Sequence, residues 1–418
     1  MMKKLNKYSF GIGDRFGSQG QAQLNAFIKA KKAGLNISPV WNKSNREHEI
    51  IGTKPVDVRI EADAAVKSLD WHDNYFVDAD HINMDNVNRF IESCDFFTID
   101  VASYIGKPAP KDEMDAFVAD CSNYTGEFNI PGTSKSFNIS TEEITKTAEQ
   151  YLYAAKMAGE IYRTIESHKG TGNFITEVSM DEVSTPQTPI QLFFILKMLS
   201  NENIPVQTIA PKFSGRFNKG INYIGNTEKF AAEFELDVLV LRQAVKEFKL
   251  PEELKLSVHS GSDKFAIYPY ISKIINKYDA GIHVKTAGTT WLEELIGLAK
   301  ADGEALQFVK DIYENALIKC DELCAPYADV IDIKTDNLPS AAEVKKWDSK
   351  RMVDSLTHDN SCKDYNPDMR QLMHVGYKLA AMQLSRYLDL LKKHSAIVNK
   401  CVSDNIYERH IKLLFFQK

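Results

Sequence analysis

Two histidines with the spacing of a shared site stand out in this sequence. His259 ends the apolar-alternating run LKLSVHS and His283 lies in the run GIHVKT, with about one helix between them. In a parallel sheet, a strand–helix–strand unit brings the ends of its strands to one edge, so both imidazoles are expected in one pocket. Imidazole combined with carboxylate suits Zn, Mn, Co or Fe(II). We therefore predict a divalent metal site of His259, His283 and Glu177, with His81 as a further candidate; the alternative for each histidine is a hydrogen-bonded wall residue.

Carboxylates that could move a proton accompany these histidines. Asp80 and Glu177 are the predicted pair, with Asp181 as a substitute. Proton transfer at a carbon centre needs one group on each side of the substrate, with pKa values tuned by burial and by the metal. The alternative for Asp80 is a helix N-cap or a turn residue. Glu177 lies inside the apolar sequence ITEVS, where a surface role is harder to explain.

Basic side chains near the same strand ends predict a site for a small anion. The candidates are Arg15, Lys212, Arg216, Lys264 and Lys285. The segment GSDK after His259 has the small residues and the lysine of an anion-binding turn that leads into a helix N-terminus. A solvated lysine is the alternative at each position. It applies least to Lys285, which period-2 alternation places on the inward face of a strand.

Eight apolar runs of strand length, most of them followed by a helical pattern, must position these groups. In order they are YSFGIG, ISPVW, YFVDAD, FFTIDV, FITEVSM, VQTIA, LKLSVHS and GIHVKT. The expected helices cover 21–33, 55–69, 86–93, 143–168, 190–199, 238–248 and 265–278. Such alternation closes most economically into an α/β fold of the (β/α)8 TIM-type barrel class, in which functional groups collect at the carboxyl ends of the strands.

All eight runs end in polar or ionisable residues, which adds Asp14 and Asp181 to the candidate binding groups, although loops are polar in any protein. The competing architecture is an open doubly wound sheet. It lacks the expected fingerprint, because no G-x-G-x-x-G precedes a helix and GIGDRFG has the wrong spacing.

Two segments exceed what a barrel needs. An insertion after the fourth strand, about 105–169, has a turn-rich centre, NIPGTSKS, and a long helix opened by a capping box from Ser140 to Glu143. After the eighth strand, 291–418 is mostly helical. We therefore expect a barrel domain over 1–300 and a helical extension over 301–418 that packs on it. His374, in this extension, is expected to be a core or surface residue.

The composition excludes several classes of protein. Of 418 residues, 44% are hydrophobic and 26% are charged, and the net charge of −6 is spread without blocks, so neither nucleic acid nor an anionic membrane is an expected partner. No long apolar run appears, and the N-terminus lacks the apolar core of a signal peptide, so we expect a cytoplasmic protein. The six cysteines form no C-x-x-C pair and are expected to be reduced structural thiols. The oligomeric state stays open.

Several longer motifs closely resemble one family. GIGDRFGSQGQAQLNAF, EVSMDEVSTPQTP, TIAPKFSGRFNKG, KLSVHSGSDKF, HVKTAGTTWLEELIGLA and YNPDMRQLMHVGYK occur in this order over about 11–378. They resemble the tagaturonate/fructuronate epimerase family of bacterial hexuronate catabolism. The resemblance implies a divalent-metal-dependent barrel epimerase that interconverts two ketohexuronates. Because the first predicted strand starts almost at the N-terminus, we expect no N-terminal extension of the kind found in longer relatives.

Carried over by position, the resemblance assigns roles to residues of this chain. Asp80 and Glu177 would be the proton-transfer pair, and His81, His259 and His283 the metal site. The strand-end groups left for substrate binding are Asp14, Arg15, Asp181, Lys212, Lys264 and Lys285.

The implied reaction inverts a hydroxyl-bearing carbon β to a ketone, whose C–H that carbonyl does not acidify. We therefore expect retro-aldol and aldol steps instead of enolisation. Two alternatives remain: a metal-dependent aldolase or keto-sugar isomerase that acts on a sugar acid, and a non-catalytic sugar-acid binding protein.

Overall fold

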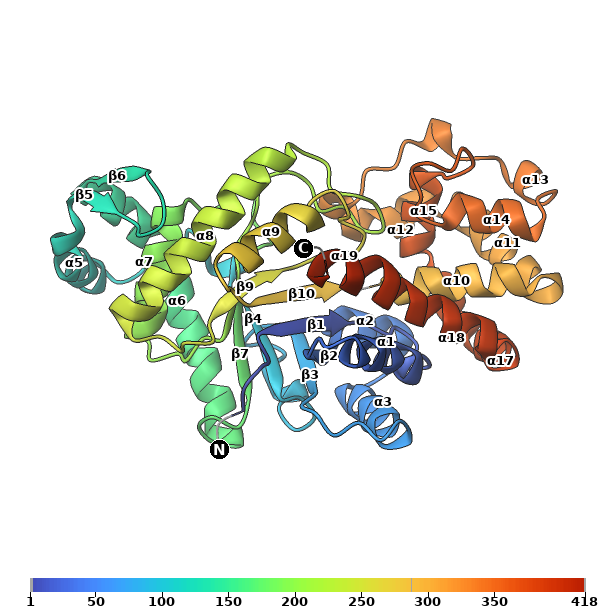
Figure 1. The fold of residues 1–418 in the computed structure, drawn as a ribbon, viewed down its shortest axis with the longest axis horizontal. Helices are drawn as coiled ribbons and strands as arrows, with labels where there is room; N and C mark the ends of the chain where they lie inside the picture. Colours follow the sequence, from blue (N-terminus) through green and yellow to red (C-terminus); the bar gives the residue numbers. More distant parts are fainter. Residues whose placement is uncertain (1–2, 287, 417–418) are drawn as a thin grey trace.

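Eight parallel strands close into a barrel in the computed structural model, which describes residues 3–286 and 288–416 (Figure 1). The strands are β1 (Tyr8–Ile12), β2 (Ile37–Ser44), β3 (Phe76–Ile82), β4 (Phe96–Asp100), β7 (Ile175–Ser179), β8 (Thr208–Ala210), β9 (Lys255–Val258) and β10 (Ile282–Thr286). Their order around the barrel follows the chain, and β10 closes it against β1. The predicted fold class is confirmed, since each apolar run forms one strand.

The strands alternate residues that face the surrounding helices with residues that face the barrel interior. On β3, Val77 and Ala79 belong to the large core under the helices, whereas Asp78 and Asp80 occupy the alternate, inward positions. A small apolar cluster fills the interior at the amino ends of the strands: Leu5, Val40, Phe76, Phe96 and Ile175. Polar residues follow on the same inward faces, so the barrel carries its ionisable groups toward the carboxyl ends.

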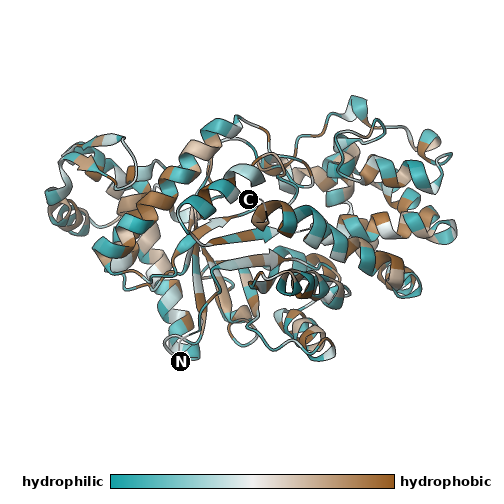
Figure 2. Cartoon of the chain, viewed as in Figure 1, coloured by the Kyte–Doolittle hydropathy of each residue, from teal (hydrophilic) through white to brown (hydrophobic). Residues whose placement is uncertain are grey.

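Helices with both hydrophobic and hydrophilic segments cover the outside of the barrel (Figure 2). They are α1 (Gly20–Lys32), α2 (Asn45–Ile51), α3 (Pro55–Ser68), α4 (Val87–Phe90), α6 (Thr141–Lys169), α7 (Pro189–Asn201), α8 (Thr227–Phe248) and α9 (Tyr268–Lys277). Each predicted helix is present, but α8 begins at Thr227 instead of 238. Asn226 caps it by accepting from Lys229 N–H at 2.6 Å, and its early residues Phe230 and Phe234 are buried. No apolar pattern predicts α2, which starts with a capping box of Ser44 and Glu47.

The insertion after β4 forms a small unit at one side of the barrel (Figure 1). It contains α5 (Lys111–Asp120) and an antiparallel hairpin of β5 (Gly126–Asn129) and β6 (Ser136–Ile139), and it ends in α6. The predicted turn-rich sequence is the hairpin turn, and the predicted capping box of Ser140 and Glu143 opens α6. Phe128 of the hairpin packs against Phe193 of α7, with ring centroids 4.9 Å apart.

The region after β10 is helical, as expected, and has a core of its own. Its helices are α10 (Thr289–Ala301), α11 (Gly303–Ile318), α12 (Cys320–Cys324), α13 (Ala341–Val344), α14 (Ser349–Leu356), α15 (Pro367–Val375), α16 (Tyr377–Ala381), α17 (Leu384–Lys393), α18 (Ser395–Asp404), the π-helical η5 (Asn405–Ile411) and α19 (Lys412–Phe415). Short 3₁₀ turns are η1 (Ala102–Tyr104), η2 (Ser122–Tyr124), η3 (Ala325–Val330) and η4 (Thr335–Asn337). Trp291 of α10, Phe308 of α11 and Tyr387 of α17 lie together in this second core.

Segment 395–415 leads from the second core, to which its Val398 belongs, back to the barrel. Val402, Ile406, Ile411 and Leu414 belong to the barrel core, and α18, η5 and α19 lie between α1 and α9 (Figure 1). This is the place that the helix after the last strand takes in a simple (β/α)8 barrel. Because α10 packs in the second core instead, the barrel contains residues from before and after residue 300. The proposed domain boundary at residue 300 stays a prediction.

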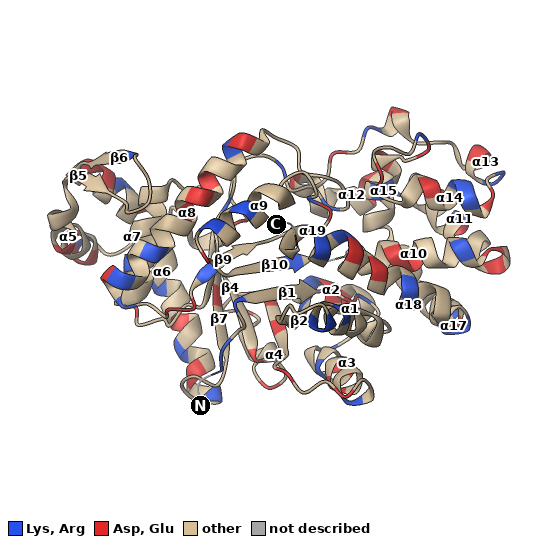
Figure 3. Cartoon of the chain, viewed as in Figure 1, with Lys and Arg blue, Asp and Glu red and all other residues tan. Residues whose placement is uncertain are grey.

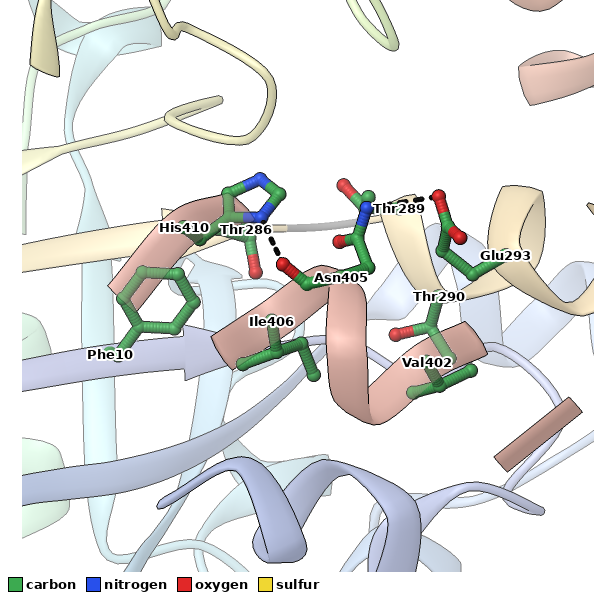
Figure 4. A pocket seen from close by; sticks show the side chains of 9 residues that line it. All are labelled: Phe10, Thr286, Thr289, Thr290, Glu293, Val402, Asn405, Ile406 and His410. Atoms are coloured by element: carbon green, nitrogen blue, oxygen red, sulfur yellow. Dashed lines mark hydrogen bonds between the residues drawn. The ribbon is translucent and has the colours of Figure 1, made fainter. Parts of the chain in front are cut away.

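A polar seam joins this returning segment to the barrel (Figure 4). Asn405 Nδ2 donates to Glu293 Oε1 of α10 at 2.9 Å, and His410 Nδ1 lies 3.0 Å from Asn405 O. His410 Nε2 accepts from Asp263 N–H at 3.1 Å, in the loop after β9. The seam encloses a cavity of about 10 Å³, the size of a single water. The loop that follows His259 is thus held from outside by η5.

Among the described residues, no helix combines the length and the apolar character needed to cross a membrane.

Candidate active site

A cavity of about 970 Å³ opens at the carboxyl ends of the barrel strands, a volume typical of small-molecule sites. Ionisable groups of the strand ends line it: Asp80, His81, Asp100, Asp181, His259 and Lys285. Arg46 after β2, Lys212 and Lys219 after β8, and Tyr327 of the C-terminal region also line it. The helical extension therefore forms part of the wall. Charges of both signs are interspersed over the rest of the molecule (Figure 3).

Lys285 lies at the centre of a buried cluster beneath the cavity. Its Nζ is 2.7 Å from Asp78 Oδ2 and 2.7 Å from Asp80 Oδ1. Glu177 Oε1 at 3.2 Å and Thr98 Oγ1 at 2.5 Å complete its surroundings. Three carboxylates thus share one ammonium.

Burial and charge set the protonation of this cluster. Burial raises the pKa of Asp78 to about 7, against the attraction of Lys285. Burial is the largest influence on Asp80 and Glu177 and opposes their ionisation, but Lys285 and the neighbouring histidines together outweigh it. The pKa of Asp80 is therefore lowered, and that of Glu177 lies well below its usual value. Despite burial, the carboxylates raise the pKa of Lys285 well above its usual value. Asp80 is therefore a carboxylate with a fixed cation beside it.

Two imidazoles, His81 and His259, face each other across the cavity floor with ring centroids 5.1 Å apart. His259 Nε2 lies 2.8 Å from Glu177 Oε1, and its Nδ1 lies 3.2 Å from Asp181 Oδ1. His81 Nδ1 lies 3.1 Å from Asp100 Oδ2. Carboxylates thus contact both nitrogens of His259 and Nδ1 of His81. A carboxylate that orients an imidazole through one nitrogen commonly supports metal binding by the other.

The end of β3 is irregular where it presents His81. This residue has a φ of 53°, in the left-handed region, and the pairing with β4 shifts between Ala79 and Ile82. Bulges of this kind re-aim side chains and are frequent next to active sites.

The side chains present fit a divalent cation. Ligand atoms of His81, Asp181 and His259 all lie within 4.8 Å of one another, as do those of His81, Asp100 and Glu182. Two imidazoles and a carboxylate are a donor set for Zn, Mn, Co or Fe(II). Despite burial, nearby carboxylates raise the pKa of His81 to about 10 and that of His259 to about 9. A cation would compete with these protons for the same lone pairs, so its uptake would release protons.

The structure does not bring His283 to this group. It pairs in register with Ser257, so it lies one inward position below Lys285 and two residues below the level of His259. Its Nδ1 lies 2.9 Å from Ser9 Oγ, and burial lowers its pKa to about 3. His283 is a neutral imidazole inside the barrel.

Glu177 also lies beneath the cavity and does not line it. Besides Lys285 and His259, it contacts Thr208, whose Oγ1 donates to Glu177 Oε2 at 2.8 Å. Of these two carboxylates beside Lys285, Asp80 therefore lines the cavity and Glu177 does not.

Two of the candidate substrate-binding residues have structural contacts instead. Asp14 accepts from the backbone N–H groups of residues 16–19, which precede α1. Lys264 Nζ donates to the carbonyls of Asn218, Ile221 and Ser262 at 2.7–2.9 Å, and neither residue lines the cavity. Lys264 thus ties the loop after β9 to the loop after β8.

Two further candidates, Arg15 and Lys212, line the cavity, but among the described residues only the charged group of Arg15 is held by another side chain. Arg15 Nε donates to Glu47 Oε1 at 3.0 Å, Nη1 donates to the carbonyl of His374 at 2.7 Å, and the guanidinium lies 3.9 Å from the ring centre of Tyr377. The ammonium of Lys212 has no ion-pair partner among the described residues. His374, expected to be either a core or a surface residue, is buried.

Three further side chains complete the site, although no role was assigned to them from the sequence: Asp78, Thr98 and Asp100. The signal that could find them is period-2 alternation. Asp78 precedes Asp80 by two residues, and Thr98 precedes Asp100 by two, on neighbouring strands. Each pair therefore shares the inward face of its strand.

A barrel that gathers imidazoles, carboxylates and a lysine in one cavity at its strand ends has the architecture of a TIM-barrel enzyme. The tagaturonate epimerase (UxaE) family matches residues 1–414, so the chain belongs to this family and is an isomerase-type enzyme. It is 27% identical to the tagaturonate/fructuronate epimerase of Thermotoga maritima, over 97% of this chain and 80% of that protein.

Solved structures show the same fold. The fructuronate-tagaturonate epimerase UxaE from Cohnella laeviribosi, complexed with one glycerol, matches with a TM-score of 0.80 at 23% identity, over 99% of this chain and 82% of that chain. The native structure of the same enzyme matches with a TM-score of 0.80 at 22% identity, over the same shares of the two chains. The family resemblance seen in the sequence is confirmed.

Proposed function

We propose that this chain interconverts D-tagaturonate and D-fructuronate with the help of a divalent cation. Family membership supports the reaction. The observation that carries the site is the cluster of Asp80, His81, Asp181, His259 and Lys285 in one cavity at the strand ends. This set provides a base, a fixed positive charge and imidazoles for a metal, the groups that carbon–carbon bond chemistry on a ketose acid needs.

His81, Asp181 and His259 would hold the cation, because their ligand atoms lie within 4.8 Å of one another. A bound divalent ion supplies a Lewis acid beside an oxygen that gains negative charge. Glu177 orients the ring of His259, and Asp100 orients the ring of His81. In this arrangement Asp181 takes the ligand position that the sequence suggested for His283.

The reaction follows a retro-aldol and aldol sequence. Asp80 takes the proton of the hydroxyl at C4, whose oxygen electrons form the carbonyl of an aldehyde. The C3–C4 electron pair moves into the C2–C3 bond, and the C2 carbonyl pair moves onto its oxygen. After the aldehyde turns its other face, C3 attacks it and Asp80 returns the proton. The ammonium of Lys285, 2.7 Å from Asp80 Oδ1, stabilises the carboxylate form that accepts the proton. Glu177, proposed from the sequence as second member of the pair, instead serves to position Lys285 and His259.

Lys212 is proposed to bind the carboxylate of the substrate. Lys285 is surrounded by three carboxylates and Arg15 is held by Glu47, so neither has a charge to spare. Lys212 lines the cavity and has no acidic partner among the described residues.

The reaction is tested by incubating the purified protein with each ketohexuronate and identifying products by NMR. We expect each substrate to give the other, with loss of activity on chelation and recovery on addition of a divalent metal. Net cleavage would indicate an aldolase, aldose formation an isomerase, and metal-independent binding without turnover a sugar-acid binding protein. The mechanism is tested in D₂O with a labelled aldehyde fragment present. Deuterium at C3 or C4 without fragment exchange would favour deprotonation over carbon–carbon cleavage.

A further inference from the structure

Asn42 is a buried amide on the wall of the cavity. It lies on β2 two residues after Val40, which belongs to the cluster inside the barrel, so both side chains face inward. Asn42 is 2% exposed and lines the cavity. Its surroundings are therefore the site and not the solvent.

Both amide atoms of Asn42, Nδ2 and Oδ1, are buried without a hydrogen-bond partner among the described residues. Leaving a buried polar group unpaired costs about 1–3 kcal/mol, so such groups usually have a partner in the working molecule. Among the described residues with unpartnered buried side-chain atoms, Asn42 alone also lines this cavity. Its missing partner is therefore expected inside the cavity.

The position of Asn42 relates it to the reacting groups. On β3, Asp78 is its register partner, and Asp80 is the register partner of Ser44, the next inward residue of β2. On the other side, Gly11 of β1 lies between Lys285 and Val40 in register, and it has no side chain to separate Lys285 from the β2 wall. A molecule bound beside Asp80 and Lys285 would thus meet Asn42.

An amide offers one acceptor and two donor hydrogens, which matches a hydroxyl group, because a hydroxyl both donates and accepts. We propose that Asn42 recognises one hydroxyl of the ketohexuronate and thereby determines which polyhydroxy acids the cavity accepts. The inference rests on the proposed function and adds to it a specificity-determining residue. A site built to pair a substrate hydroxyl rejects an analogue that lacks it, because the protein amide is then left unpaired.

The test compares wild type with Asn42→Leu, which keeps the approximate shape of the side chain and removes both hydrogen-bonding atoms. Both proteins are assayed on the full substrate and on analogues that each lack one hydroxyl. For one analogue, we expect wild type to lose about tenfold in kcat/KM, the value of one buried hydrogen bond. Asn42→Leu should lose about tenfold on the full substrate and show no further loss on that analogue. Asn42→Ala serves the same comparison if the leucine variant does not fold.

Asn218→Leu is the matched control, because Asn218 is 0% exposed, has both amide atoms unpartnered among the described residues, and does not line the cavity. It should keep the selectivity of wild type. Equal losses on every analogue in Asn42→Leu, or kinetics identical to wild type, would overturn the inference and indicate that Asn42 binds water only. Failure of the wild-type protein to epimerise either ketohexuronate would instead count against the proposed function.

Discussion

Asp80 lies beside both a cation and an imidazole. Lys285 Nζ lies 2.7 Å from its Oδ1, and His81 Nε2 lies 3.9 Å from the same oxygen. A carboxylate in this position lines the cavity without belonging to either group of clustered metal-ligand atoms. At the scale of single residues, the proposed proton acceptor and the proposed metal ligands are therefore different side chains.

Asp80→Asn should test this separation. We expect the variant to bind metal as wild type does but to lose at least about 10²-fold in kcat, because it lacks the proton acceptor. His259→Ala is the matched variant, and it should lose both metal and turnover while it keeps the fold. Metal content by elemental analysis, circular dichroism and NMR assays give the three readouts. Full metal occupancy in His259→Ala would show that His259 is not a ligand.

Lys212→Met should raise KM by about tenfold or more with a smaller change in kcat, because binding of the substrate carboxylate is shared by ground state and transition state. Lys212→Arg keeps the charge and should recover most of the affinity. An unchanged KM in Lys212→Met would move the carboxylate site to Arg46 or Lys219, which also line the cavity.

The sequence predicted part of this site for a physical reason. Asp80, His81 and His259 stand where their strands end, and the ends of parallel strands meet at one edge. His283 lies deeper in the barrel, because its strand continues through Lys285 to Thr286. Residue types alone do not show at which level of a barrel a side chain stands; that depends on the register between strands, here Ser257 opposite His283.

At the scale of elements, the seam between α10 and η5 depends on one buried carboxyl. Burial raises the pKa of Glu293 to about 7, although Arg370 and Arg409 counteract it. Its Oε1 accepts from Asn405 Nδ2 at 2.9 Å, a bond that the protonated acid keeps. This seam therefore favours an uncharged residue at position 293.

Glu293 should make stability depend on pH. In the unfolded chain its pKa is near 4.5, so the folded state binds the extra proton between that pH and about 7. Its contribution is fully present below the unfolded pKa and is lost as pH rises through 7. Glu293→Gln keeps an acceptor for Asn405, and we expect it to flatten this slope and to be more stable at pH 8, by up to about 3 kcal/mol. Urea unfolding at pH 5, 6.5 and 8 measures the effect; parallel pH profiles for both proteins would contradict it.

The elements themselves were mostly predictable because each buries a regular face. The eight strands and the capping box at Ser140 follow from local patterns. Local patterns do not show which helix completes the ring around the barrel, since α10 and α18 are both apolar enough to cover β10 and β1. That choice depends on the second core, where Trp291 and Tyr387 hold α10 away from the strands.

At the scale of the whole molecule, segment 395–415 should contribute to barrel stability as a core element. Ile411 is 0% exposed in the barrel core, whereas Leu413, two residues on, is 36% exposed. Ile411→Ala should lower the free energy of unfolding by about 2–5 kcal/mol, and Leu413→Ala by less than about 1 kcal/mol. Equal effects in denaturant unfolding would mean that the segment is attached to the barrel without completing its core.

The return of 395–415 to β1 has a consequence during synthesis. The ribosome makes Phe10 and the rest of β1 first, yet the residues that cover this side of the barrel, such as Ile406, emerge almost four hundred residues later. Because chains grow at about 5–20 residues per second, the uncovered strand waits for tens of seconds. A nascent chain of this enzyme therefore exposes apolar surface on this side of the barrel until residues 395–415 have been made, and such surface is prone to aggregate.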